Sequence, residues 1–286
     1  MKGLPNISSV KTAEPILIVD LFPPVLDELL ALLEGLSEAQ WSASTVCRGW
    51  CVKDVALHLL GGDVGILSRK RDQYSHGGPV TDAEQLLQLV NNLNDTWVTA
   101  ARRMSPQLVV DLLRHLGAQL CHYFAALDPF ALGEPVSWAG PEPAPVWLDL
   151  AREYTEKWHH QQQIRDAVGA DPLYQAKYFR PVLDTFVRAL PFTLRDVRTS
   201  EGECVRVNIS GESGGKWLVI RQKEGWSLFV DGGQPIKALA EVTIDQDAAW
   251  RLFTKGIEVE SARARSVVNG DEDVARTILS MVSVIA

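Results

Sequence analysis

Apolar residues recur at helical spacing through the first two thirds of the chain. In residues 23–36 the apolar side chains fall three or four positions apart, which lines them along one face of a helix. The same spacing returns in four later segments, each long enough for a helix that packs through one apolar face. We therefore predict helices over residues 23–36, 51–74, 81–104, 105–124 and 147–168.

Residues at the segment ends fit the start and stop signals of helices. Thr81, with Glu84 three residues later, forms a capping box, and Pro106 stands at the first position of the next helix. Gly169 follows the last segment, where a glycine commonly ends a helix. The proline-rich residues 128–145 predict a loop. Long helices with one apolar face indicate a bundle, and this loop leaves room for a crossover between its helices.

Beyond about residue 196 the apolar period changes to alternation. Val205, Val207 and Ile209 alternate with polar residues, which is the period of a strand. The fold class predicted is therefore a helical bundle at residues 1–195 followed by a small α+β domain at 196–286. A helix at 174–190 could belong to either part. The α+β domain is predicted to contain strands over 204–210, 217–222, 226–230 and 241–245, a hairpin turn at 223–225, and helices over 247–254 and 271–285.

Composition favours a globular protein that acts on small molecules. Hydrophobic residues make up 46% of the 286 residues and the net charge is -8, which disfavours disorder and binding to nucleic acid or anionic membranes. No segment predicts a signal peptide or a membrane-spanning helix. The spacing of the four cysteines indicates reduced thiols rather than a disulfide framework. We expect a cytoplasmic protein.

One segment of the predicted helix 147–168 offers metal-binding chemistry. Glu156 and His160 are four residues apart, so their side chains leave the same face of the helix, one turn apart. His159 is one residue off and points about 100° away. A carboxylate oxygen and an imidazole nitrogen suit zinc and several other first-row divalent ions.

A third ligand would have to come from a neighbouring helix. His58 lies among aliphatic residues in the predicted helix 51–74, and a partly buried imidazole needs a partner. Each observation also has a plainer interpretation when taken alone. A Glu/His pair at this spacing is most often a surface contact, and a lone core histidine is usually hydrogen-bonded.

Two segments resemble the DinB-like, mycothiol-dependent maleylpyruvate isomerase family. Residues 46–59 resemble the entry to the second helix of that family, where the first metal-binding histidine follows an Asp by four residues. Residues 156–166 resemble its last bundle helix, which supplies a Glu and then a His four residues later. Residues 215–217, 226–228, 247–252 and 268–271 look like the sterol-carrier-like domain often appended in the family. The first segment matches at Gly49, Trp50, Val52, Lys53, Asp54 and His58.

The resemblance implies a DinB-like four-helix bundle in which His58, Glu156 and His160 bind one divalent metal ion, expected to be zinc. It also implies a low-molecular-weight thiol such as mycothiol in the fourth coordination position, held as a thiolate. Addition of the thiolate to an electrophilic carbon, followed by rotation and thiol loss, would isomerise a maleylpyruvate-like substrate. Retention of the adduct would give S-transfer.

Two other functions remain open, as does the oligomeric state, for which a homodimer is one option. The metal could bind a water for hydrolase-like chemistry. Alternatively, the metal could be structural in a non-catalytic carrier whose C-terminal domain binds an apolar ligand. An open fourth coordination position favours the two enzymatic interpretations.

Several further residues have two interpretations each. Asp54 could orient a metal ligand or stabilise the start of its helix. Arg165, together with Arg102 or Arg103, could bind a substrate carboxylate. His122, near Cys121, is a spare ligand candidate. Residues expected to have ordinary roles are His76 and His115 at the surface, Cys47 and Cys51 as packed thiols, and Trp50 and Trp158 as core residues that could wall the metal pocket.

Overall fold

The computed structural model describes residues 10–74, 83–233 and 235–283 of the chain. Its internal contacts divide it into two units. The bundle unit contains residues 18–129 and 152–173, and the sheet unit contains residues 10–17, 130–151 and 174–283.

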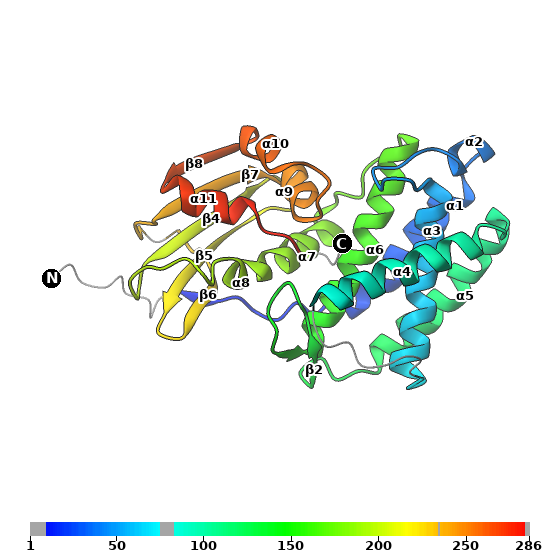
Figure 1. Cartoon of the computed structure of the whole chain (residues 1–286), viewed down its shortest axis with the longest axis horizontal. Helices are drawn as coiled ribbons and strands as arrows, with labels where there is room; N and C mark the ends of the chain where they lie inside the picture. The colour runs from blue at the N-terminus through cyan, green and yellow to red at the C-terminus, as the bar shows by residue number, and fades with distance from the viewer. Residues whose placement is uncertain (1–9, 75–82, 234, 284–286) are drawn as a thin grey trace. The chain divides into compact units, whose positions relative to one another are not determined.

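Five long helices run through the region predicted to be helical (Figure 1). Pro106 occupies the first turn of α5, whose start is capped by the Ser105 side chain, and Gly169 adopts a φ of +67° just after α6. The predicted cap at Thr81 lies outside the described residues. The long helices are α1 (Phe22–Glu34), α3 (Val52–Ile66), α4 (Ala83–Ala101), α5 (Pro106–Ala125) and α6 (Val146–Val168).

Two details of the bundle unit depart from the predicted elements. The predicted helix 51–74 changes character at its end, where α3 continues as one π-helical turn, Leu67–Arg71. Two short elements were not predicted, a 3-10 turn at Val19–Leu21 and the helix α2 at Glu38–Trp41. None of the described helices is both long enough and apolar enough to span a membrane.

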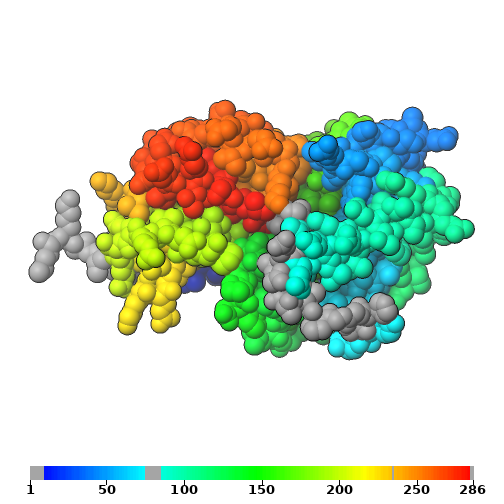
Figure 2. All heavy atoms as spheres, viewed as in Figure 1, coloured from blue at the N-terminus to red at the C-terminus, as the bar shows by residue number. Residues whose placement is uncertain are grey.

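Apolar side chains from these helices form one core. The helix α3 contacts both α4 and α5, and α5 also contacts α1. The helix α6 adds Ile164 to the same cluster. Residues of α4 and α5 lie on the surface of the bundle (Figure 2), where Leu89 and Leu93 are exposed. Core members that are almost fully buried include Leu33, Val52, Val55, Ala56, Leu57, Leu60, Val98, Val109, Leu113 and Ile164.

The sheet unit is built on a six-stranded sheet in the order β1-β6-β5-β4-β7-β8. The pairing is antiparallel throughout except between β4 and β7, which are parallel. The alternation predicted for β4 is confirmed, because Val205, Val207 and Ile209 are buried. The strands are β1 (Lys11–Thr12), β4 (Cys204–Ser210), β5 (Gly215–Gln222), β6 (Gly225–Val230), β7 (Ala240–Asp245) and β8 (Ser266–Gly270).

Helices of the sheet unit contact its strands. The helix α9 (Gln246–Phe253) contacts β4 and β7, α8 (Leu190–Thr193) contacts β6, and α11 (Glu272–Leu279) contacts β7. The helix α11 ends earlier than the predicted helix 271–285. Beyond it, Ser283 leaves helical geometry to donate hydrogen bonds to the carbonyls of Phe253 and Phe186.

Three further segments differ from the predicted elements. The predicted loop 128–145 contains a small antiparallel pair, β2 (Leu132–Pro135) and β3 (Pro143–Pro145). The strand β8 and the helix α10 (Val259–Ala264) were not predicted at all. The segment of β8 has no buried alternation, because it is an edge strand with Val267 exposed.

The contacts also divide the chain differently from the single boundary that we predict at residue 195. The helix α7 (Ala176–Phe186) belongs to the sheet unit, because it contacts α9 and buries the side chains of Phe179, Val182 and Phe186. Residues 10–17 join the same unit because β1 pairs with β6. The first residues of α6, up to Ala151, are also grouped with the sheet unit.

Candidate metal centre

His58 is positioned by the start of α3. The side chain of Asp54 accepts a hydrogen bond from the backbone N–H of Cys51, which satisfies a donor at the helix start. Leu57 and Leu59 on either side of His58 are buried in the bundle core. The aliphatic neighbours therefore anchor α3 and hold His58 at the edge of the core.

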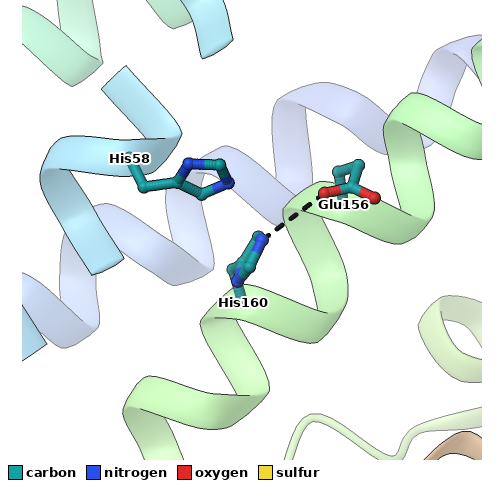
Figure 3. Close-up of side chains that lie close together, drawn as sticks. All are labelled: His58, Glu156 and His160. Atoms are coloured by element: carbon teal, nitrogen blue, oxygen red, sulfur yellow. Dashed lines mark ion pairs between the residues drawn. The ribbon is translucent and has the colours of Figure 1, made fainter. Parts of the chain in front are cut away.

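Glu156 and His160 lie one turn apart on α6, as the sequence spacing predicts. Nε2 of His160 is 3.4 Å from Oε2 of Glu156. His58 approaches this pair from α3, and its ring points toward them (Figure 3). One ligand atom from each of the three side chains lies within 4.8 Å of the other two. The structure therefore brings the three predicted ligands together from two segments about a hundred residues apart.

Aromatic contacts hold the His58 ring in place. Its centroid is 4.6 Å from that of His160, in an edge-to-face arrangement, and 5.2 Å from that of Trp50. Nδ1 of His58 is buried and has no hydrogen-bond partner among the described residues. The prediction that Trp50 walls the site is consistent with this contact.

Burial and neighbouring charges shift the pKa values of the three histidines in different directions. Burial, followed by the charge of His160, lowers the pKa of His58 to about 3, and the same two causes lower the pKa of His159 to about 4. Both imidazoles are therefore neutral at pH 7, the form that binds metals. His159 does not share the site, because its Nδ1 lies 2.9 Å from the carbonyl oxygen of Thr155.

His160 and Glu156 form a charge pair. Burial acts to lower the pKa of His160, but hydrogen bonds with Cys47 and Glu156 outweigh it and raise the pKa to about 9. Burial acts to raise the pKa of Glu156, but His159 and His160 outweigh it and hold the pKa well below its usual range. The positive charge on protonated His160 therefore neutralises the Glu156 carboxylate. A metal cation bound between the side chains would neutralise it in the same way.

The donor set and its surroundings fit a divalent transition metal. Two imidazole nitrogens and one carboxylate oxygen match the three protein ligands typical of a catalytic zinc site, which leaves a fourth position for another ligand. The Glu156 side chain is 26% exposed, so the cluster is not sealed from solvent. A buried imidazole atom without a partner, as in His58, also fits a residue whose role is ligation rather than packing.

Two neighbours of the site were not predicted. Oε1 of Gln163 lies 2.8 Å from Nδ1 of His160 and 3.1 Å from Sγ of Cys47. Gln163 follows His160 by three residues and lies on the same face of α6. This spacing is the feature of the sequence from which the contact could have been predicted. Nothing in the sequence indicated that Cys47 reaches it.

The predicted carboxylate-binding arginines already have partners. Arg102 makes a bidentate contact with Asp54, with distances of 2.8 and 3.0 Å. Arg165 is buried and bonds to Glu28, Gln161 and the carbonyl oxygen of Asp171. The structure therefore supports the helix-start interpretation for Asp54 and gives Arg165 a structural role between α1 and α6. Arg103 is exposed.

The remaining predicted residues lie elsewhere. Among the described residues, the cluster of possible metal ligands does not include His122. His115 is exposed and contacts Gln119. Trp158 is fully buried and donates to the carbonyl of Leu173, which makes it a core residue. His76 lies outside the described residues.

Comparison with known proteins identifies the family. A family model described as the mycothiol maleylpyruvate isomerase N-terminal domain matches residues 22–165, half of the chain. The chain belongs to this family. Membership confirms the resemblance seen in the sequence and supports an enzyme of the thiol-dependent isomerase type. The matched range contains His58, Glu156 and His160.

Solved structures support the same fold. The chain is similar to the crystal structure of the mycothiol-dependent maleylpyruvate isomerase, with 12% identity and a TM-score of 0.51. It is similar as well to a histidine-to-alanine mutant of that enzyme, with 11% identity and a TM-score of 0.50. Each match covers 82% of this chain and 86% of the other. At such identity the likeness shows the fold alone, and it confirms the predicted fold class. No curated protein sequence matches the chain.

Proposed function

We propose that His58, Glu156 and His160 bind one divalent metal ion, with zinc as the expected ion. The observation that carries the proposal is the convergence of three ligand atoms within 4.8 Å, from two helices, around a partly exposed carboxylate. Neutral His58 and ionised Glu156 are already in the protonation states that ligation requires. Only the proton on His160 has to leave.

The bound metal would supply a Lewis-acidic position at which a low-molecular-weight thiol is held as its thiolate. The Glu156 carboxylate would neutralise one of the two positive charges of the metal ion. Trp50 packs against the His58 ring and restricts its rotation. Gln163 bonds to His160 on the side away from Glu156.

We further propose that the thiol is mycothiol or a similar compound, and that the chain catalyses isomerisation of a maleylpyruvate-like substrate or S-transfer to an electrophile. The family match supports this, because the family is named for mycothiol maleylpyruvate isomerase. All four cysteines are free, consistent with the reducing cytoplasm in which such a thiol acts. For the sheet unit we keep the sterol-carrier-like relationship as a proposal, supported by its mixed sheet with helices.

The test combines metal analysis with thiol titration. Wild-type protein and the variants His160→Ala and His115→Ala are loaded with zinc, desalted and analysed for metal. We then titrate each with mycothiol and follow binding by calorimetry. His115→Ala is the matched control, because His115 is an exposed histidine outside the cluster.

We expect about one zinc per chain and thiol binding for wild type and His115→Ala, and loss of both for His160→Ala. A wild-type protein that cannot be loaded with a divalent metal contradicts the proposal. Zinc loading without any thiol response favours hydrolase-like chemistry with a metal-bound water instead.

A further inference from the structure

One buried amide oxygen serves two partners beside the candidate ligands. Gln163 is 6% exposed and His160 is 9% exposed. Oε1 of Gln163 lies 2.8 Å from the imidazole Nδ1 and 3.1 Å from Sγ of Cys47. Both distances are within hydrogen-bond range.

The chemistry of an amide oxygen decides which atoms carry hydrogen. A carbonyl oxygen accepts hydrogen bonds and cannot donate. The imidazole Nδ1 of His160 must therefore carry its proton, and in the neutral ring this leaves the lone pair on Nε2. Nε2 is the atom that faces Glu156, at 3.4 Å. Gln163 thus selects the tautomer whose lone pair points toward the candidate metal position.

The second contact concerns a thiol that could itself bind a metal. Cys47 lies in the turn before α3, where its carbonyl accepts a hydrogen bond from the N–H of Trp50. Its S–H donates to Gln163, on the Nδ1 side of the His160 ring. The thiol and Nδ1 of His160 therefore share one acceptor, and the thiol also contacts the His160 side chain. The same bond ties the turn before α3 to α6.

We propose that Gln163 is a positioning residue, which fixes the tautomer and ring orientation of His160 and keeps the Cys47 thiol away from the open coordination position. This inference rests on the proposed metal site. Its consequence is that the protein's own sulfur does not compete with an incoming low-molecular-weight thiol.

The test uses three variants of the full-length chain. Gln163→Leu removes the acceptor at similar volume, and Gln163→Glu restores an acceptor at the same place. Gln162→Leu is the matched control, because the buried Gln162 bonds to Asp166 and to the N–H of Leu173, outside the site. Two readouts are needed: the zinc dissociation constant from chelator competition, and the NMR signal and exchange rate of the His160 Nδ1 proton with and without zinc.

We expect Gln163→Leu to bind zinc roughly 10–100-fold more weakly, the usual effect of losing a partner of a ligating histidine, and to lose the protected Nδ1 proton. Gln163→Glu should bind at least as tightly as wild type. Gln162→Leu should lose thermal stability but keep its zinc affinity and the protected proton.

A folded Gln163→Leu protein with wild-type zinc affinity, or with the Nδ1 proton still protected, overturns the inference. Failure of the proposed function looks different, because the wild-type protein itself would then bind no zinc. In that case the positioning role is decided by comparing the exchange rate of the Nδ1 proton between metal-free wild type and metal-free Gln163→Leu. Equal protection in the two proteins counts against it.

Discussion

Nε2 of His160 lies 3.4 Å from Oε2 of Glu156, one turn earlier on α6. Hydrogen bonds with Cys47 and Glu156 raise the pKa of His160 to about 9, and His159 and His160 hold the pKa of Glu156 well below its usual range, so the two groups form an ion pair at pH 7. His58 completes the group from α3 with a neutral imidazole. The site therefore already contains one negative ligand and one neutral ligand, and a metal ion has to displace a single proton.

Glu156→Gln tests the contribution of that carboxylate. An amide is neutral and a weak ligand, so we expect zinc affinity to fall by at least roughly 100-fold, given that changes to partners of ligands alone cost 10–100-fold. Chelator competition measures the effect. Glu153→Gln is the control, because Glu153 lies one turn earlier and pairs with Arg152 instead. Equal losses in the two variants would contradict a specific role for Glu156.

Two neighbouring glycines of α3 should respond in opposite directions to alanine. A Cβ at Gly61 would lie 2.6 Å from Cδ1 of Trp97, an indole fixed by its hydrogen bond to the carbonyl of Leu57. A Cβ at Gly62 meets nothing within 4 Å. We expect Gly62→Ala to stabilise the chain by about 0.5–1 kcal/mol through helix propensity, and Gly61→Ala to destabilise it by about 1–3 kcal/mol through overpacking.

Urea unfolding of both glycine variants provides the measurement. The pair controls for helix propensity, since both positions are inside the same helix. Stabilisation by Gly61→Ala would show that α4 does not pack against α3 in this way.

Asp54 should make stability depend on pH. Burial acts to raise its pKa, but hydrogen bonds from Arg102 and Cys51 outweigh it and lower the pKa below the ordinary value of 3.8. The stabilisation is therefore present above pH 3.8 and is lost as the pH falls through the lower, folded-state value. At pH 7 we expect Asp54→Asn to be less stable by about 1 kcal/mol, because the neutral amide loses the ion pair with the half-exposed Arg102 and the favourable negative charge at the helix start.

The difference between wild type and Asp54→Asn should shrink when unfolding is repeated near the acid limit of the folded state. A constant difference across the pH range would show that the ionised carboxylate is not what stabilises α3.

Asp63 and Lys157 form a buried ion pair beside the apolar core. Asp63 is 2% exposed, and Lys157 also lies 3.4 Å from the carbonyl oxygen of Leu59. Lys157→Met should cost roughly 3–5 kcal/mol, because it leaves a buried carboxylate without a partner. The double variant Lys157→Met/Asp63→Leu should recover most of that loss. A double variant as unstable as the single one would mean that the pair is not the cause.

The common face of Glu156 and His160 could be predicted from the sequence because it depends on local periodicity. The four-residue spacing of Glu156 and His160 sets their common face on any regular helix. The approach of His58 could not be derived from spacing, because it depends on how α3 packs on α6. It was predicted only through the family resemblance.

Other features depend on contacts that a pattern of apolar residues does not encode. The bond from Cys47 to Gln163 joins a turn to a helix more than a hundred residues later. The grouping of α7 with the sheet unit follows from its contact with α9, although its apolar stripe fits either part equally well. Edge strands such as β8 have no buried face, so they lack the alternation that predicted β4.

The most direct measurement is a crystal structure of the zinc-loaded protein with anomalous diffraction data collected at the zinc edge. We predict one strong anomalous peak, about 2.0–2.2 Å from a nitrogen of His58, a nitrogen of His160 and an oxygen of Glu156. A zinc-loaded crystal with no peak between these side chains, or with the peak on other residues, would contradict this prediction.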